Sequence, residues 1–371
     1  MMINFIHYDN FFICYALFFS VFLIALFIDR LVGEFPNKIH PVVLIGRIIG
    51  LFKNLFIDLN SHISSLILVG GVFLVFFIFC GIIYQILKFL PLIFVVFIMG
   101  ILFSQAFSIK FLLDSAERIR FTLDNKDINT GRREVAKIVS RPTASLERPY
   151  LISATIESLS ENITDSVIGP IFYYFVFGFI IIIVFSFSHL FDSSFLVTNL
   201  NLFIFNNIEI RPNIIVIDII YLSVILVFIY RIINTMDAMV GYNTPKYKKI
   251  GFLPAIFDDL INLIPARIAG YLMVFASYIL GMDWRNSYQT LKHDAKNCDS
   301  PNSGYTMAAC AGALGIQLSK KSHYKIGYPF KRLESYDIRR AYNLSRWTIF
   351  LYILIQIFLT ILILIIIRFI L

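Results

Sequence analysis

The chain has 371 residues, of which 58% are hydrophobic and only 15% charged, and its formal net charge is +8. Soluble domains average about 45–50% apolar and about 25% charged residues, so this composition excludes a soluble single domain and a disordered chain. In a membrane protein, excess Lys and Arg is typical of cytoplasmic loops, so no nucleic-acid partner is expected. The four cysteines form no CxxC pair, which gives no support for a zinc site.

Apolar runs long enough to cross a bilayer recur along the chain, since a spanning helix needs about 20 apolar residues. The predicted spans are residues 11–28, 66–87, 89–107, 168–190, 214–230 and 347–371. A weaker run, 263–281, contains Pro265 and Arg267 and is predicted to be re-entrant or to lie at the interface. The sequence therefore predicts one all-α, polytopic integral membrane domain, residues 1–371, with about six transmembrane helices.

The distribution of basic residues orients these spans. Segments 108–167 and 282–346 contain nine and eleven Lys/Arg, whereas the first 28 residues contain none. By the positive-inside rule, the N-terminus is predicted outside and the polar segments are predicted on the cytoplasmic face of the cell membrane. These polar segments are 29–65, 108–167, 231–262 and 282–346. Since no basic residue precedes the first run, it is predicted to be a retained span rather than a signal peptide.

Three acids at a four-residue spacing form the first candidate site. Glu157, Glu161 and Asp165 would share one face of a helix, where like charges repel. A cation should compensate, and carboxylates are suitable Mg²⁺ ligands. The alternative is a solvated face neutralised by Arg141 and Arg148. These three acids, which we call the acidic ladder, lead directly into the next predicted span, 168–190, and this position favours a role at the membrane edge.

Further polar residues follow the fifth predicted span. Asn234 and Asp237 lie three residues apart on one predicted helix face, which an ordinary basic loop explains poorly. Asp258 and Asp259 come next, with Arg267 in the weak apolar run. Paired carboxylates beside an arginine suit the binding of a metal-bound phosphate. The alternative is a salt bridge between Arg267 and one aspartate.

Two more segments contain candidate phosphate-binding groups. A helix is predicted to begin at Pro301 with Ser300 as its N-cap, and its free backbone N–H groups, near Asn302, would form an anion site. The alternative is a helix whose small residues only serve packing. Arg47 lies among apolar residues and needs a partner, unless its side chain extends to the lipid headgroups.

Six segments together resemble the adenosylcobinamide-phosphate synthase family of cobalamin biosynthesis (CbiB/CobD). They run from near residue 29 to near residue 318 in the family's order. The segments are DRLVGEFPNKIHPVVLIGR, GRREVAKIVSRPT, ESLSENITDSVIGP, YRIINTMDAMVGY, DDLINLIPAR and DSPNSGYTMAACAGALG. The sequence departs from the family in the Phe/Ile-rich connection 191–213 and in the strongly basic segment 131–150.

The resemblance implies a ligase that uses ATP and Mg²⁺ to join adenosylcobyric acid, a corrinoid, to (R)-1-amino-2-propanol or its O-phosphate. The catalytic candidates are Glu157, Glu161, Asp237 and Asp258. The candidate metal ligands are Glu157, Glu161, Asp165 and Asp237. The candidate substrate- or phosphate-binding residues are Arg47, Asn162, Asn234, Arg267, Ser300 and Asn302. The expected partners are these substrates and the lipid bilayer, with a possible association with other corrinoid enzymes.

Two other classes of protein share some of these features. A Mg²⁺-dependent membrane phosphotransferase acting on a lipid would suit the tandem aspartates at 258 and 259, but the chain has no DxxxD-type lipid motif. A transporter would place its polar groups near the midplane of broken helices, whereas here they lie beyond the ends of the predicted spans. ATP-dependent consumption of adenosylcobyric acid would separate the three classes.

Overall fold

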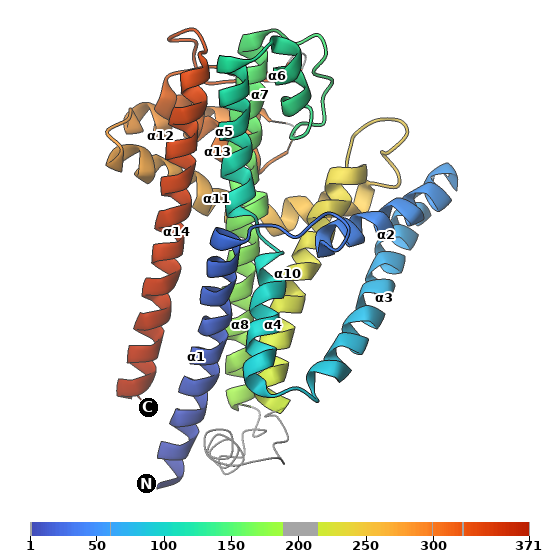
Figure 1. The fold of residues 1–371 in the computed structure, drawn as a ribbon, viewed down its shortest axis with the longest axis vertical. Helices are drawn as coiled ribbons and strands as arrows, with labels where there is room; N and C mark the ends of the chain where they lie inside the picture. Colours follow the sequence, from blue (N-terminus) through green and yellow to red (C-terminus); the bar gives the residue numbers. More distant parts are fainter. Residues whose placement is uncertain (1, 60, 188–213, 299, 321–322, 371) are drawn as a thin grey trace. The chain divides into compact units, whose positions relative to one another are not determined.

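The computed structural model describes residues 2–59, 61–187, 214–298, 300–320 and 323–370, which are almost entirely helical (Figure 1). The α-helices are α1 (Met2–Leu31), α2 (Pro41–Phe56), α3 (His62–Leu87), α4 (Leu92–Ser104), α5 (Ile109–Asn125), α6 (Ile128–Val135), α7 (Arg148–Ile163), α8 (Gly169–Phe187), α10 (Ile214–Val240), α11 (Phe252–Ile279), α12 (Trp284–Asp294), α13 (Gly304–Leu314) and α14 (Ser335–Ile370). Short turns of other helix types are η1 (Ile57–Leu59), η2 (Thr164–Ile168) and η3 (Ala295–Asn297), and the strands β1 (Leu318–Lys320) and β2 (Tyr324–Ile326) pair antiparallel. The all-α prediction is confirmed, while the connection 191–213 lies outside the described residues.

Seven of the described helices are long and apolar enough to cross a membrane. Six of these helical stretches overlap the predicted spans, one of them running through α4 and α5, and the seventh is α11. α11 begins well before the predicted run 263–281 and continues through Pro265 without a break. A re-entrant segment therefore does not fit, because such a segment turns back within the membrane.

The helices group into two compact units. Unit 1 comprises residues 1–107, 170–258 and 356–371, and unit 2 comprises residues 108–169 and 259–355. Three of the boundaries fall inside continuous helices, namely α8, α11 and α14. The prediction of one domain over the whole chain stays a prediction.

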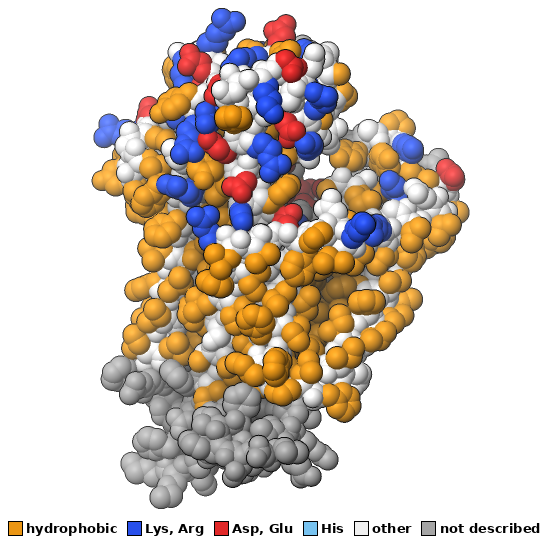
Figure 2. Space-filling view, viewed as in Figure 1, with side chains coloured by type: hydrophobic (Ala, Val, Ile, Leu, Met, Phe, Trp, Pro, Cys, Tyr) orange, Lys and Arg blue, Asp and Glu red, His pale blue; other side chains and the backbone are white. Residues whose placement is uncertain are grey.

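Unit 1 has an aromatic core where α8 meets α1 and α4. The Tyr174 ring stacks on Phe18 (centroids 4.3 Å apart) and on Phe103 (4.1 Å), and its hydroxyl donates to the Phe18 carbonyl (2.7 Å). Large apolar side chains also point outward, among them Phe27 and Leu74, which are 65% and 62% exposed. Figure 2 shows such side chains covering unit 1 on the face in view, as expected of helices that contact lipid.

Unit 2 is built on close packing of α12 against α13. Gly312 makes this possible, because a Cβ there would lie 2.6 Å from the Asn286 carbonyl oxygen. The Ser287 hydroxyl donates to the Ala309 carbonyl (2.8 Å) across the same contact. At the start of α13, a Cβ on Gly304 would lie 2.0 Å from a backbone oxygen. The small residues of α13 therefore serve packing, as one sequence-based alternative proposed.

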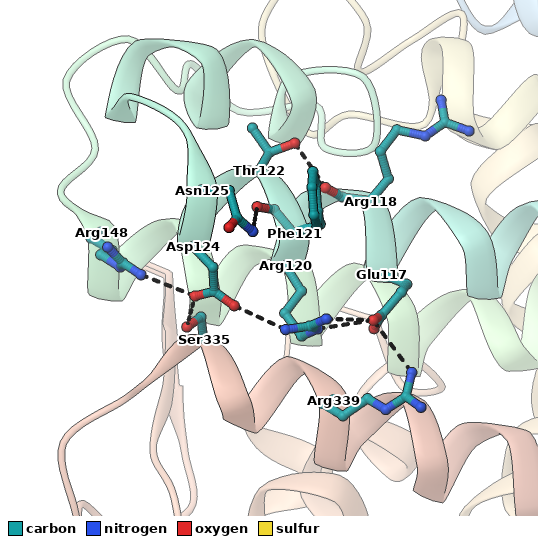
Figure 3. Close-up of polar contacts among 10 residues, drawn as sticks. All are labelled: Glu117, Arg118, Arg120, Phe121, Thr122, Asp124, Asn125, Arg148, Ser335 and Arg339. Atoms are coloured by element: carbon teal, nitrogen blue, oxygen red, sulfur yellow. Dashed lines mark hydrogen bonds and ion pairs between the residues drawn. The ribbon is translucent and has the colours of Figure 1, made fainter.

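An ion-pair network joins α5 to α14 within unit 2 (Figure 3). Arg120 donates to Glu117 (2.7 Å) and Asp124 (2.9 Å) along α5. Arg339 reaches the same Glu117 oxygen from α14 (3.3 Å), and Ser335 donates to Asp124. Each exposed pair adds little stability by itself, but the set fixes α5 beside the first turns of α14.

These contacts constrain how the chain crosses the membrane. Segments 108–167 and 282–346 bond to one another in unit 2, so they lie on the same side. An even number of crossings must therefore separate them. α8, α10 and α11 are the candidate crossings among the described residues between these segments, and the interfacial prediction for 263–281 stays a prediction.

Candidate functional site

Glu157 on α7 lies at the centre of a buried polar cluster in unit 2. Its Oε2 accepts hydrogen bonds from Arg141 Nη2 (3.0 Å) and the Tyr324 hydroxyl (2.9 Å). Ser153 donates to the other oxygen and accepts from the backbone N–H of Ser319 (3.0 Å). The Glu157 side chain is 5% exposed and that of Arg141 is 17% exposed. The structure therefore supports neutralisation of this acid by Arg141.

Tyr324 on β2 connects this cluster to the segment before α13. Burial and then the charge of Glu157 raise the pKa of the Tyr324 hydroxyl well above its usual value. The charge of Glu161 acts in the same direction. The phenol therefore remains protonated at physiological pH and can keep donating to Glu157. The hairpin thereby places a proton donor near Glu157 and Glu161.

The acidic ladder continues into the π-helical turn η2. Such turns recur at functional sites. Here the Ser166 carbonyl accepts the backbone N–H of Ser108 (2.9 Å), which links η2 to the residue that precedes α5. Asn162 Nδ2 donates to the Ser158 carbonyl one turn earlier (2.8 Å). The Asn162 amide is therefore partly engaged by its own helix.

The four acids predicted to hold Mg²⁺ are divided between the units, with Asp237 in unit 1 and the others in unit 2. The described residues contain no group of three or more His, Cys, Asp or Glu side chains that could hold a metal ion. Glu157 is engaged by Arg141, so it fits a ligand role poorly. Nucleotide-bound Mg²⁺ commonly takes one or two carboxylates plus phosphates, which half-buried Glu161 and Asp165 would suit.

Arg267 on α11 is held in place by neighbours in unit 2. Its Nη1 donates to the Leu263 carbonyl (2.6 Å) and to Asn302 Oδ1 (3.1 Å). The guanidinium lies 4.6 Å from the centroid of the Tyr305 ring. Among the described residues of unit 2, Arg267 has no ion pair with Asp259, so a salt bridge to that acid does not explain its position. Nε and Nη2 have no hydrogen bond in this unit and can face a ligand.

The turn before α13 is tied to α11. Asn302 Nδ2 donates to the Asp259 carbonyl (2.8 Å), and the Ser300 hydroxyl donates to the Asp259 carboxylate (3.1 Å). Ser300 Oγ also accepts the backbone N–H of Asn302 (3.3 Å). These bonds hold the segment as a turn, so α13 starts at Gly304 and the predicted helix start at Pro301 is wrong. Ser300, Asn302 and Arg267 nevertheless lie together, and their phosphate-binding roles stay predictions.

Asn234 and Asp258, two further predicted site residues, are joined in unit 1. Asn234 Nδ2 donates to Asp258 Oδ1 (3.3 Å), and Arg231 Nη1 donates to Asn234 Oδ1 (3.3 Å). Asp237 lies one turn further along α10. A Cβ on Gly241 would lie 1.8 Å from Asp237 Oδ1, so the glycine leaves room for this carboxylate at the end of the helix.

Arg47 lies exposed on the surface of α2 in unit 1. Its Nη2 is 3.5 Å from the Asn37 carbonyl, which is at most a weak hydrogen bond. Leu44 and Leu51, also on α2, are 40% and 64% exposed. An arginine among exposed apolar residues suits the alternative in which its side chain extends to headgroups. Its predicted phosphate role stays a prediction.

His40 is a candidate residue that the sequence did not reveal. Gly33, with φ of +80°, ends α1, and the Pro36 carbonyl accepts the backbone N–H of His40 (3.1 Å). His40 then caps α2, since its Nδ1 accepts the N–H of Val42 (3.2 Å), and Pro41 takes the first helical position. The residue is 7% exposed, and its Nε2 has no hydrogen-bond partner among the described residues.

Burial lowers the pKa of His40 from its ordinary value of 6.5, opposed by the charge of Glu34 and assisted by that of Arg231. The His40 ring therefore takes up a proton more readily in the unfolded chain than in the folded chain. The resulting stabilisation is complete above pH 6.5 and is lost as the pH falls below it.

We expect the unfolding temperature in detergent to fall between about pH 7.5 and 5.5 more steeply for the parent than for His40→Asn. Asparagine retains a capping oxygen but does not titrate, so equal slopes would contradict the prediction.

Comparison with known proteins identifies relatives along most of the chain. The family model described as "CobD/Cbib protein" matches residues 22–196 and 215–345. A protein of Methanothermobacter thermautotrophicus named "Probable cobalamin biosynthesis protein CobD" is 38% identical over 333 residues, covering 90% of this chain and 95% of that protein. Proteins of the same name from Pyrococcus furiosus and Methanocaldococcus jannaschii are 36% and 34% identical, covering 86% and 83% of this chain and 90% and 87% of their own. No solved structure matches the chain.

Proposed function

This chain belongs to the CobD/CbiB family, and on that premise we propose that it is an amide ligase of cobalamin biosynthesis. The proposed reaction joins the propionate carboxyl of adenosylcobyric acid to the amine of (R)-1-amino-2-propanol or its O-phosphate, with ATP as co-substrate. The names of the relatives support a role in cobalamin biosynthesis, and the spanning helices support a place in the bilayer.

The chemistry requires an activated carboxyl group, because a carboxylate does not react with an amine at neutral pH. In the proposed sequence, a carboxylate oxygen attacks the γ-phosphorus of ATP, so that ADP leaves and an acyl phosphate forms. The amine nitrogen then attacks the acyl carbon, phosphate leaves, and the nitrogen gives up a proton to a base. Such a site needs cationic groups on the phosphates and a carboxylate near the amine.

The Arg267 arrangement is the observation that carries the proposal. Two bonds on Nη1, to Leu263 and Asn302, fix the guanidinium while other N–H groups remain for phosphate oxygens. A guanidinium binds two phosphate oxygens at once, which suits it to hold the transferred group. Asn302 acts as a positioning residue, since it bonds both Arg267 and the Asp259 carbonyl.

The proposed proton acceptors are Glu161, Asp237 and Asp258. Asp258 accepts a hydrogen bond from Asn234, which orients its carboxylate (3.3 Å). Mg²⁺, entering with ATP, would neutralise part of the phosphate charge, and Glu161 and Asp165 are the acids proposed to contact it. Glu157 is assigned to the structural pair with Arg141.

Purified protein in detergent tests the reaction directly. Adenosylcobyric acid should be consumed only when ATP, Mg²⁺ and the amino alcohol or its phosphate are all present, with stoichiometric release of ADP. An Arg267→Ala enzyme should lose this turnover, whereas Arg118→Ala, an exposed arginine on α5, should retain it. Consumption without ATP, or ATP-dependent phosphorylation of a lipid instead, would overturn the proposal.

The positions of the polar segments relative to the membrane provide a separate prediction. We propose that the N-terminus is outside and that unit 2 carries its polar segments on the cytoplasmic side, because the basic residues concentrate there. Single cysteines at Arg133 and His323 should resist an impermeant reagent in intact cells, whereas one at Phe89 should react. All three positions are exposed, and the control background replaces Cys298 with serine, since Cys14, Cys80 and Cys310 are buried. Labelling at position 323 without labelling at position 89 would contradict this orientation.

A further inference from the structure

We propose that His40 is a ligand-binding residue, and that His40, Glu34, Arg231, Asn234 and Asp258 of unit 1 form a binding site for a phosphorylated amino alcohol. We call these five residues the His40 cluster. The identity of the ligand rests on the proposed function, which requires an amino alcohol or its phosphate, whereas the existence of the site rests on the geometry of His40.

The N–H group of the His40 ring is the first argument. Nδ1 accepts the Val42 N–H, so the neutral ring carries its proton on Nε2. This donor is buried and has no acceptor among the described residues. Burying a donor without a partner is unfavourable, so such groups are rare unless a water or a ligand supplies the acceptor. An oxygen of a bound ligand would satisfy it.

The position of this donor at the start of α2 is the second argument. The first backbone N–H groups of a helix give its N-terminus a partial positive charge, which favours an anionic oxygen nearby. The Arg231 guanidinium acts on the His40 ring as well, so a full positive charge is within electrostatic reach. A phosphate group could bind here, because its oxygens would be contacted by a neutral imidazole donor, a helix N-terminus and a guanidinium.

The acids of the His40 cluster define the other end of the ligand. Glu34 acts on the His40 ring from the segment before α2, and Asp258 bonds Asn234, which in turn bonds Arg231. A simple phosphate ion would be repelled by these two carboxylates. A ligand with a phosphate at one end and an ammonium group a few bonds away satisfies both signs of charge.

Two sources supply this chemistry: free (R)-1-amino-2-propanol O-phosphate and the headgroup of phosphatidylethanolamine. Either would place its phosphate towards His40 and Arg231 and its ammonium group towards Asp258 or Glu34.

Two substitutions of His40 separate ligand binding from helix capping. In His40→Asn, the side-chain oxygen can still accept the Val42 N–H, but the donor at Nε2 is lost. In His40→Gln, the longer amide can present an N–H close to the Nε2 position, but the capping geometry is lost. A purely structural His40 predicts normal ligand binding in His40→Asn and weaker stability in His40→Gln.

The experiment is calorimetric titration of the full-length protein in lipid-free detergent, without ATP or corrinoid. We expect (R)-1-amino-2-propanol O-phosphate to bind the parent, and its Kd to rise at least about tenfold in His40→Asn and less in His40→Gln. Inorganic phosphate and unphosphorylated 1-amino-2-propanol should each bind the parent at least about tenfold more weakly than the joined ligand. In a second arm, retention of phosphatidylethanolamine is measured by native mass spectrometry for the same three proteins.

Each outcome decides the proposal. His40-dependent binding of the free ligand assigns the site to the substrate, and His40-dependent retention of the lipid alone assigns it to the headgroup. Binding in neither arm, or binding that His40→Asn leaves unchanged, overturns the site. Phosphate alone binding as tightly as the joined ligand overturns the amino-alcohol assignment. Because the titration needs no turnover, an enzyme that fails to form the amide yet binds the ligand would refute the proposed function and not this site.

Discussion

Replacing Glu157 with glutamine is expected to lower the stability of unit 2 by about 3 kcal/mol. Glutamine keeps the size of the side chain and one accepting oxygen, but it removes the charge that neutralises Arg141. With 17% of its side chain exposed, Arg141 has little access to water that would replace this partner. The Tyr324 hydroxyl also loses a charged acceptor, so the attachment of β2 to α7 weakens.

Tryptophan fluorescence during denaturation in detergent measures this effect selectively. The chain contains two tryptophans, Trp284 and Trp347, and both lie in unit 2. The matched control is Glu134→Gln, which removes a surface pair whose Lys137 is 62% exposed and should cost less than about 1 kcal/mol. If Glu157→Gln instead retains parental stability and loses turnover at limiting Mg²⁺, the acid is a metal ligand and not a structural partner.

The sequence predicted the elements that depend on long hydrophobic patterns. Each predicted span lies within, or largely overlaps, a helix of the structure, because a run of about 20 apolar residues has few alternatives to a buried helix. The interfacial prediction for 263–281 depended on Arg267 and on charge distribution, and it stays a prediction, because α11 is itself long and apolar enough to cross a membrane. The start of α13 was misplaced, because Ser300 bonds Asp259 instead of capping a helix.

The candidate site was predictable only where the chemistry depends on residue type. Arg267, Ser300 and Asn302 were selected as phosphate-binding types, and the fold brings them together. Glu157 was predicted to be a catalytic residue and metal ligand, whereas the structure pairs it with Arg141. Its partner Tyr324 comes from a hairpin with strands of three residues, too short for a recognisable alternation. His40 was not predicted, because a histidine before a proline in the sequence indicates neither that the ring is buried nor that its Nε2 lacks a partner among the described residues.

The Arg267→Lys variant is expected to bind ATP more weakly although the charge is kept. The guanidinium can hold the Leu263 carbonyl and Asn302 with one nitrogen and still present further N–H groups to phosphate. An ammonium group has a single nitrogen, so it must give up either these anchors or the ligand. We expect the KM for ATP to rise by about tenfold or more, with a smaller change in the KM for the corrinoid.

Matched variants distinguish this role from a structural one. Arg118→Lys, on the exposed surface of α5, should leave both constants unchanged. Asn302→Ala should raise the KM for ATP in the same direction, because it releases Nη1 of Arg267 and frees the turn from Asp259. Tryptophan fluorescence should show Arg267→Lys close to parental stability, since in unit 2 the native arginine forms no ion pair with Asp259 that lysine would break. Unchanged constants for both substrates in Arg267→Lys would assign this arginine to packing against Tyr305 and transfer the phosphate-binding role to Arg47.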